Sequence, residues 1–126
     1  PRSTLFPYTT LFRSRLLADG RLTMKLWIDD IRPAPNKEYL WAQSVNEAKA
    51  MIMYYIKDYW DNTILIDLDH DAGDYAFDGD DYIKLLDWLE NEGYVDEGFT
   101  FHIHSMNPVG IQNMRAIIQK NGWQEV

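Results

Sequence analysis

The chain has 126 residues, 46% of them hydrophobic, which suits one globular domain with a buried core and is too short for two. It contains no cysteine, so disulfide bonds, cysteine-ligated zinc and cysteine nucleophiles are excluded. A net charge of −8 argues against a surface that binds the backbone of a nucleic-acid duplex, and no apolar run approaches the roughly 20 residues of a membrane span.

The first 23 residues differ in composition from the rest of the chain. They contain four Arg and one acidic residue, and their apolar residues follow no regular period. Residues 1–14 resemble a common sequencing adaptor translated in one frame, as in a metagenomic reading frame. An Arg-rich targeting peptide is the alternative, but its apolar part is too short and broken for a secretory signal. We therefore expect a non-native or disordered leader over 1–23, a domain over 24–126 and a cytoplasmic protein.

From Met24 onward, short apolar runs predict five strands. They cover residues 25–28, 39–42, 62–68, 99–104 and 123–126. After the first strand, Pro33 and Pro35 prevent an immediate helix. The first connection is therefore predicted to be a loop.

Three helices are predicted between the later strands. Ser44 and Glu47 have the spacing of a capping box and start a helix that continues to about residue 60. A second helix covers about 80–92, with Asp80 and Asp81 at its start, where they would favour the helix dipole. Asn107, as an N-cap followed by proline, starts the third, which runs to about residue 120.

Polar side chains follow three of the predicted strands. Strands that alternate with helices imply right-handed crossovers and a parallel sheet, whose carboxyl ends lie along one edge. The side chains at these ends are Asp29 and Asp30, then Asp69, His70 and Asp71, then His104, Ser105 and Asn107. We expect them to meet at one site.

The third strand leads into a loop that is crowded with carboxylates. It contains Asp67, Asp69, Asp71, Asp74, Asp78, Asp80 and Asp81. Like charges at this density repel one another unless a cation or protons lie among them. A solvated acidic loop is the alternative, but His70 between two Asp favours a site. Such an oxygen-rich pocket suits Mg²⁺, or Mn²⁺, and the predicted ligands are Asp29, Asp30, Asp69 and Asp71.

The same loop approaches the spacing of a calcium-binding loop. The matching positions are Asp67, Asp69, Asp71, Gly73 and Asp78. The loop lacks Gly at the sixth position and Glu at the twelfth, and a strand-type run precedes it. These differences argue against calcium.

Three blocks, in order, resemble the cyclic-phosphate processing receiver family. The blocks are WIDDIRPAP, LDHDAG with a later DG, and HIHSMNPVG, and the resemblance covers essentially 24–126. It implies an α/β, receiver-like (flavodoxin-like) fold, a three-layer sandwich with a mostly parallel five-stranded sheet. It also implies a reduced helix set, since the loop at 33–36 takes the place of the first receiver helix.

In response-regulator receivers, the first strand ends in an acidic pair, the third in a phosphoacceptor Asp, the fourth in Ser or Thr and the fifth in Lys. The matching residues here are Asp29, Asp30, Asp69 and Ser105. No Lys follows the last strand, which argues against a phosphorelay. Instead, the chain has His70 and His104, which match the DHD and HSxNPxG blocks of the cyclic-phosphate branch.

The resemblance implies a ligand with a cyclic phosphate, either a cyclic nucleotide or a cyclic-phosphate end of RNA. Opening such a ring needs an activated water, a proton donor for the leaving oxygen and positive charge on the phosphate oxygens. We assign catalysis to Asp69, His70 and His104, and phosphate contact to Arg32, Ser105 and Asn107. The alternatives are a non-enzymatic receiver that senses a ligand or partner protein, and a receiver that is phosphorylated on Asp69.

Overall fold

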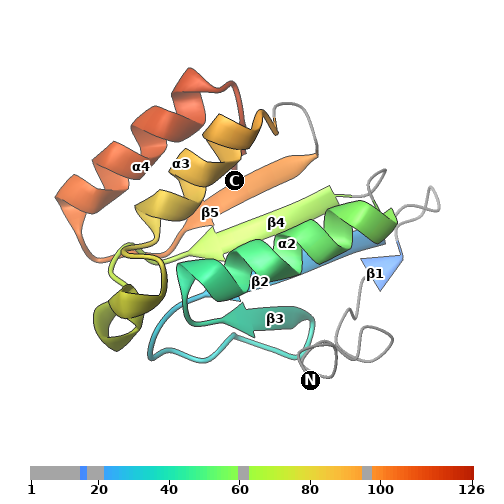
Figure 1. Cartoon of the computed structure of the whole chain (residues 1–126), viewed down its shortest axis with the longest axis horizontal. Helices are drawn as coiled ribbons and strands as arrows, with labels where there is room; N and C mark the ends of the chain where they lie inside the picture. Colours follow the sequence, from blue (N-terminus) through green and yellow to red (C-terminus); the bar gives the residue numbers. More distant parts are fainter. Residues whose placement is uncertain (1–14, 17–21, 60–62, 95–97) are drawn as a thin grey trace.

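The computed structural model describes residues 15–16, 22–59, 63–94 and 98–126, and a mostly parallel sheet forms its centre (Figure 1). The parallel strands are β2 (Leu22–Ile28), β3 (Tyr39–Ala42), β4 (Thr63–Leu68), β5 (Phe99–Ile103) and β6 (Gln124–Glu125). They pair in the order β3-β2-β4-β5-β6, which is the flavodoxin-like order 2-1-3-4-5 when counted along the chain. The short strand β1 (Arg15–Leu16) pairs antiparallel with the beginning of β2. The predicted α/β class and sheet are confirmed.

Three α-helices cover one face of this sheet. They are α2 (Val45–Tyr59), α3 (Ile83–Glu92) and α4 (Pro108–Lys120). Each helix connects two parallel strands in the same direction across the sheet, so right-handed crossovers place all three on one side. Figure 1 looks onto that side. The described residues therefore form two layers rather than three, because a loop replaces the helix after β2 and no other described helix covers the second face.

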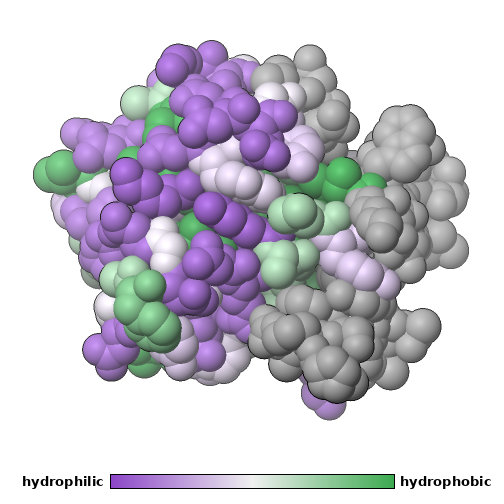
Figure 2. Space-filling model, viewed as in Figure 1, coloured by the Kyte–Doolittle hydropathy of each residue, from purple (hydrophilic) through white to green (hydrophobic). Residues whose placement is uncertain are grey.

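The helix-covered face contains the hydrophobic core. Leu26, Ile66 and Phe101, on the three central strands, are fully buried in it. From α4, Met114 and Ile118 join the same core at a spacing of four residues. The outer surface of the helices is mainly hydrophilic (Figure 2), as expected for amphipathic helices. No helix in the described ranges combines the length and apolar character that crossing a bilayer requires.

Two predicted helix starts are confirmed by their caps. The N–H of Glu47 donates to Ser44 Oγ at 3.0 Å, at the start of α2. The N–H of Gly110 donates to Asn107 Oδ1 at 3.0 Å, and proline occupies the first turn of α4. These local sequence signals therefore give the correct starts of the two helices.

The start of α3 differs from the prediction. The helix begins at Ile83, after the short 3-10 helix η2 (Gly73–Asp78), and its first turn contains no acidic residue. The Asp81 carboxylate instead accepts the backbone N–H of Ala72 at 3.0 Å, and Asp80 has a left-handed φ of 73°. The prediction that the helix begins at these two acids is wrong, because both precede α3 and the Asp81 side chain holds the loop before it.

The second face of the sheet carries a row of aromatic and ionisable side chains. Trp41, Trp27, Asp67 and His102 are aligned across four neighbouring strands, so their side chains share a face. Trp27 and Asp67 are buried, although neither is part of the core cluster on the helix-covered face. His104, two residues after His102, continues this row beyond the end of β5. The row therefore leads to the carboxyl edge of the sheet.

Candidate functional site

The strand order reverses between β2 and β4, and open parallel sheets bind ligands at the carboxyl edge beside such a reversal. Asp29 follows β2, Asp69 follows β4 and His104 follows β5. The N–H of Asp69 donates to the carbonyl of Ile28 at 2.9 Å, and the N–H of His104 donates to the carbonyl of Leu68 at 3.0 Å. Backbone pairing between the strands thus continues to these residues and fixes their positions.

The Asp29 carboxylate is buried and has a partner at each oxygen. Its Oδ1 accepts the N–H groups of Ile31 at 2.9 Å and Arg32 at 2.7 Å, and its Oδ2 lies 3.0 Å from His104 Nε2. Burial raises the pKa of Asp29, but these N–H groups and His104 outweigh it and hold the pKa below its usual value. Asp29 is therefore ionised at neutral pH.

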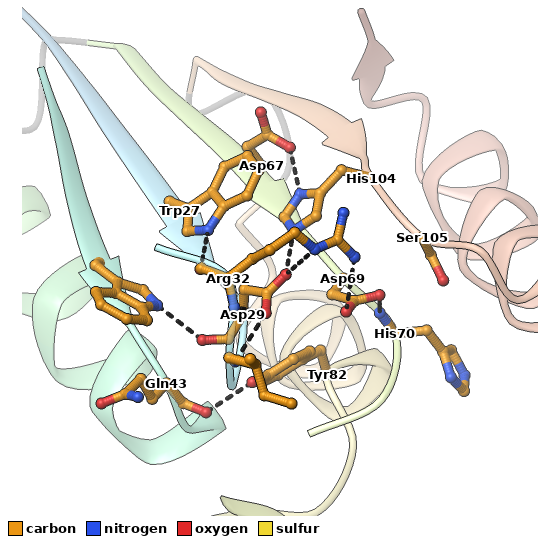
Figure 3. Close-up of polar contacts among 12 residues, drawn as sticks. Trp27, Asp29, Arg32, Gln43, Asp67, Asp69, His70, Tyr82, His104 and Ser105 are labelled. Atoms are coloured by element: carbon orange, nitrogen blue, oxygen red, sulfur yellow. Dashed lines mark hydrogen bonds and ion pairs between the residues drawn. The ribbon is translucent and has the colours of Figure 1, made fainter. Parts of the chain in front are cut away.

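His104 is held on three sides (Figure 3). Its Nδ1 lies 2.7 Å from Asp67 Oδ1, and its Nε2 lies 3.0 Å from Asp29 Oδ2. Its ring stacks on Trp27, with the ring centroids 3.7 Å apart and the planes at 2°. The Trp27 indole in turn donates to the carbonyl of Arg32 at 2.8 Å, so the loop after β2 is tied to the stack. The imidazole consequently has little freedom to rotate.

Asp67 joins two histidines. Its Oδ1 lies 2.9 Å from His102 Nδ1 and 2.7 Å from His104 Nδ1. Burial raises the pKa of Asp67, but the two imidazoles lower it by more, and the pKa lies below its usual value. Sequence reasoning did not select Asp67 as a site residue. A signal was present, because Asp67 precedes Asp69 by two residues and so shares its face of the sheet.

Arg32 reaches two carboxylates from the solvent side. Its Nε lies 3.5 Å from Asp29 Oδ2 and its Nη2 lies 3.7 Å from Asp69 Oδ2, with 54% of the side chain exposed. Contacts this long and this exposed are weak. The guanidinium can therefore turn toward a ligand. Asp69 also accepts the N–H of His70 at 2.8 Å through Oδ1.

Asp29, Asp69 and His104 form a group that could hold a metal ion. One ligand atom from each lies within 4.8 Å of the other two. Two carboxylate oxygens and one imidazole nitrogen are suitable donors for a divalent cation, so these residues fit the cation expected from the sequence. Burial, and then the charges of Asp29 and Asp69, raise the pKa of the neighbouring Asp30. A cation among these carboxylates would relieve that repulsion.

Among the described residues, this group contains neither Asp30 nor Asp71, the other two predicted metal ligands. The Asp30 carboxylate lies against Gly73, where any side chain would collide with it. Asp71 is largely exposed, and its Oδ1 lies 2.8 Å from Nδ1 of His70. The His70 ring points away from His104 (Figure 3). The structure therefore brings one of the two predicted histidines to the metal-binding group and places the other beside it.

Ser105 and Asn107 have backbone partners in the turn between β5 and α4. The N–H of Asn107 donates to Ser105 Oγ at 3.1 Å, and Asn107 Oδ1 caps α4. Asn107 Nδ2 also lies 3.4 Å from His70 Nδ1. Both residues thus have a structural role, and their contact with a phosphate stays a prediction.

Gly110 allows the first turn of α4 to approach His70. A Cβ at this position would lie 2.5 Å from Cγ and Cδ2 of the His70 ring. We expect Gly110→Val to displace His70 and to lower the free energy of unfolding by about 1–3 kcal/mol, which is the usual cost of overpacking. Urea denaturation measures this change. Ala116→Val, at an exposed position of the same helix, is the control, and equal effects of the two would contradict the close contact.

A comparison with protein families matches residues 24–120 to the cyclic-phosphate processing receiver domain. The chain belongs to this family. The matched range includes Asp29, Arg32, Asp69 and His104, and no curated protein or solved structure matches the chain.

In this cyclic-phosphate processing receiver domain, the carboxylates of the possible calcium loop take part in separate contacts. Asp67 contacts the two strand histidines, and Asp71 contacts His70. Asp78 accepts a hydrogen bond from Ser44 Oγ at 2.6 Å. Since calcium needs its ligands to converge, this arrangement does not support a calcium loop.

Proposed function

We propose that this receiver domain binds a cyclic phosphodiester at the carboxyl edge of the sheet, together with a divalent cation held by Asp29, Asp69 and His104. The observation that carries the proposal is the convergence of three ligand atoms within 4.8 Å, beside Arg32 and at the reversal of strand order. The family description supports the class of ligand. The proposed ligands are a cyclic nucleotide or a cyclic-phosphate end of RNA, with Mg²⁺ or Mn²⁺.

Arg32 and Ser105 are the proposed phosphate contacts on the protein side. Arg32 would exchange its long contacts with two carboxylates for a short, charge-assisted hydrogen bond to a phosphate oxygen. Ser105 Oγ accepts the N–H of Asn107, so its hydroxyl hydrogen can be donated to a second oxygen. When bound, the cation supplies positive charge to the remaining phosphate oxygens.

Ring opening is the further step of this proposal. Water would attack phosphorus and give up a proton to a base, the bond to one ring oxygen would break, and that oxygen would take up a proton from the same base. With Nδ1 of His70 hydrogen-bonded to Asp71, Nε2 is the nitrogen that would exchange the proton. His70 would first have to turn, because its ring points away from His104 (Figure 3).

A ligand sensor that uses the same site without turnover is the second candidate. Nδ1 of His104 contacts the Asp67 carboxylate, and Nε2, beside Asp29, would bind the cation, which leaves neither nitrogen for proton transfer to a ligand. This observation favours binding over hydrolysis.

The two candidates differ in their products. We would incubate the chain with Mg²⁺ or Mn²⁺ and with 2′,3′-cyclic nucleotides, 3′,5′-cyclic nucleotides and cyclic-phosphate RNA, and follow the ligands by phosphorus NMR and the melting temperature of the protein. We expect cation-dependent ligand binding that Asp69→Asn weakens by at least about tenfold. Asp74→Asn, an exposed residue of the same acidic loop, is the matched control.

A ring-opened product would identify a hydrolase. Saturable binding with no product would identify a sensor. If no ligand in this set changes the NMR spectrum or the melting temperature with either cation, the proposed function is wrong.

A further inference from the structure

The environment of His104 is more restrictive than a general acid or base requires. Its side chain is 9% exposed, its ring is stacked on Trp27, and each ring nitrogen faces a different carboxylate. A histidine that exchanges protons with a ligand needs one nitrogen open to it. A histidine that binds a metal needs a ring held in one orientation, which the stacking on Trp27 and the two carboxylates provide.

The two carboxylates around His104 are not equivalent. Asp29 lies at the carboxyl edge and belongs to the group that could hold a metal ion, whereas Asp67 lies inside β4 and is outside that group. Asp67 Oδ1 is the acceptor nearest to Nδ1, at 2.7 Å. When a cation replaces the hydrogen between Nε2 and Asp29, a proton held on Nδ1 by Asp67 leaves the lone pair of the neutral ring on Nε2. That nitrogen faces Asp29 and the proposed cation.

We propose that Asp67 positions His104 as an Nε2 metal ligand, and that the site consequently selects a first-row transition metal cation such as Mn²⁺ or Zn²⁺ over Mg²⁺. The inference rests on the proposed function, since the same side chains hold the cation. Mg²⁺ prefers oxygen ligands and retains several waters. An imidazole nitrogen beside two carboxylates favours the softer, transition-metal cations, and this preference increases from Mn²⁺ toward Zn²⁺.

Trp27 contributes the second constraint on the ring. Its indole plane is parallel to the imidazole, at a centroid distance of 3.7 Å, and is anchored by its hydrogen bond to the carbonyl of Arg32. A half-turn of His104 about its Cβ–Cγ bond would move the ring nitrogens away from both carboxylates, and smaller rotations would also break the stacking. The direction of Nε2 is therefore set before a cation binds, which is the geometric requirement for a selective site.

The first experiment uses the unmodified chain and no cyclic phosphate. Isothermal titration calorimetry with Mg²⁺, Mn²⁺ and Zn²⁺ is expected to give affinities for Mn²⁺ and Zn²⁺ at least about tenfold higher than for Mg²⁺. In ¹⁵N NMR, addition of Zn²⁺ is expected to shift the Nε2 resonance of His104 while Nδ1 keeps its proton. Equal affinities for the three cations, or an Nε2 resonance that does not move, would overturn the inference.

Variants then distinguish a role of Asp67 in positioning His104 from a general effect of Asp67 on the stability of the protein. Asp67→Asn is expected to weaken Mn²⁺ and Zn²⁺ binding by about 10–100-fold, which is the usual effect of losing the partner of a ligating histidine. His102→Gln removes the other imidazole at Asp67 Oδ1 and is expected to change these affinities by less than about twofold. If Asp67→Asn does not fold, His104→Gln tests the same point, because it should remove the preference for Mn²⁺ and Zn²⁺ and leave Mg²⁺ binding to the carboxylates.

Failure of this inference is distinguishable from failure of the proposed function. If the site binds Mg²⁺ as tightly as Mn²⁺ and still binds a cyclic phosphate, only the inference about Asp67 and metal selection is wrong. If Zn²⁺ shifts the Nε2 resonance of His104 but the protein binds no cyclic phosphate, only the proposed function is wrong.

Discussion

Asp29→Ala is expected to lower the free energy of unfolding by about 3–5 kcal/mol, because it removes a buried carboxylate that accepts hydrogen bonds from several groups. His104 would lose its partner at Nε2, and the N–H groups of Ile31 and Arg32 would lose their acceptor. Groups left unsatisfied after burial cost more than the net value of the hydrogen bonds that they made. Urea denaturation of the metal-free protein measures the change.

Asp69→Ala is the matched comparison for this prediction. The Asp69 side chain accepts one N–H, at 2.8 Å, and its contact with Arg32 is 3.7 Å long. We expect a loss of about 1 kcal/mol, the net value of one hydrogen bond. Both variants should lose cation binding, and equal destabilisation by the two would contradict the buried, structural role of Asp29.

Phe101→Ala is also expected to cost about 3–5 kcal/mol, the usual loss for a large buried aromatic residue. Phe101 is 0% exposed at the centre of β5, and its ring stacks on Trp123 with centroids 5.0 Å apart. The substitution leaves a cavity in the core between the sheet and the helices. We expect a lower urea midpoint with little change in the dependence of the unfolding free energy on urea.

Phe77→Ala tests whether burial causes this effect. It makes the same substitution in η2, where Phe77 is 84% exposed. We expect a change within about 0.5 kcal/mol, as for most surface positions. A loss comparable to that of Phe101→Ala would mean that Phe77 packs against a surface that the structure does not place there.

Local signals in the sequence predicted the elements well. The caps formed by Ser44 and Asn107 and the apolar run before Asp69 depend only on neighbours along the chain, and the structure reproduces them. The exception is the start of α3. Asp81 could satisfy either the helix dipole or a loop N–H, and the N–H of Ala72 lies too far away in sequence for a local pattern to identify it.

The sequence by itself determined the alternation of strands and helices, the family resemblance and the positions of Asp29, Asp69 and His104 at strand ends. Only the tertiary structure decided what each side chain faces. The contacts of Asp67 and Trp27 with His104 depend on the register of three neighbouring strands, and the direction of His70 depends on its packing against α4. Such contacts join residues far apart in the chain, and the pattern of residue types along a single strand does not encode them.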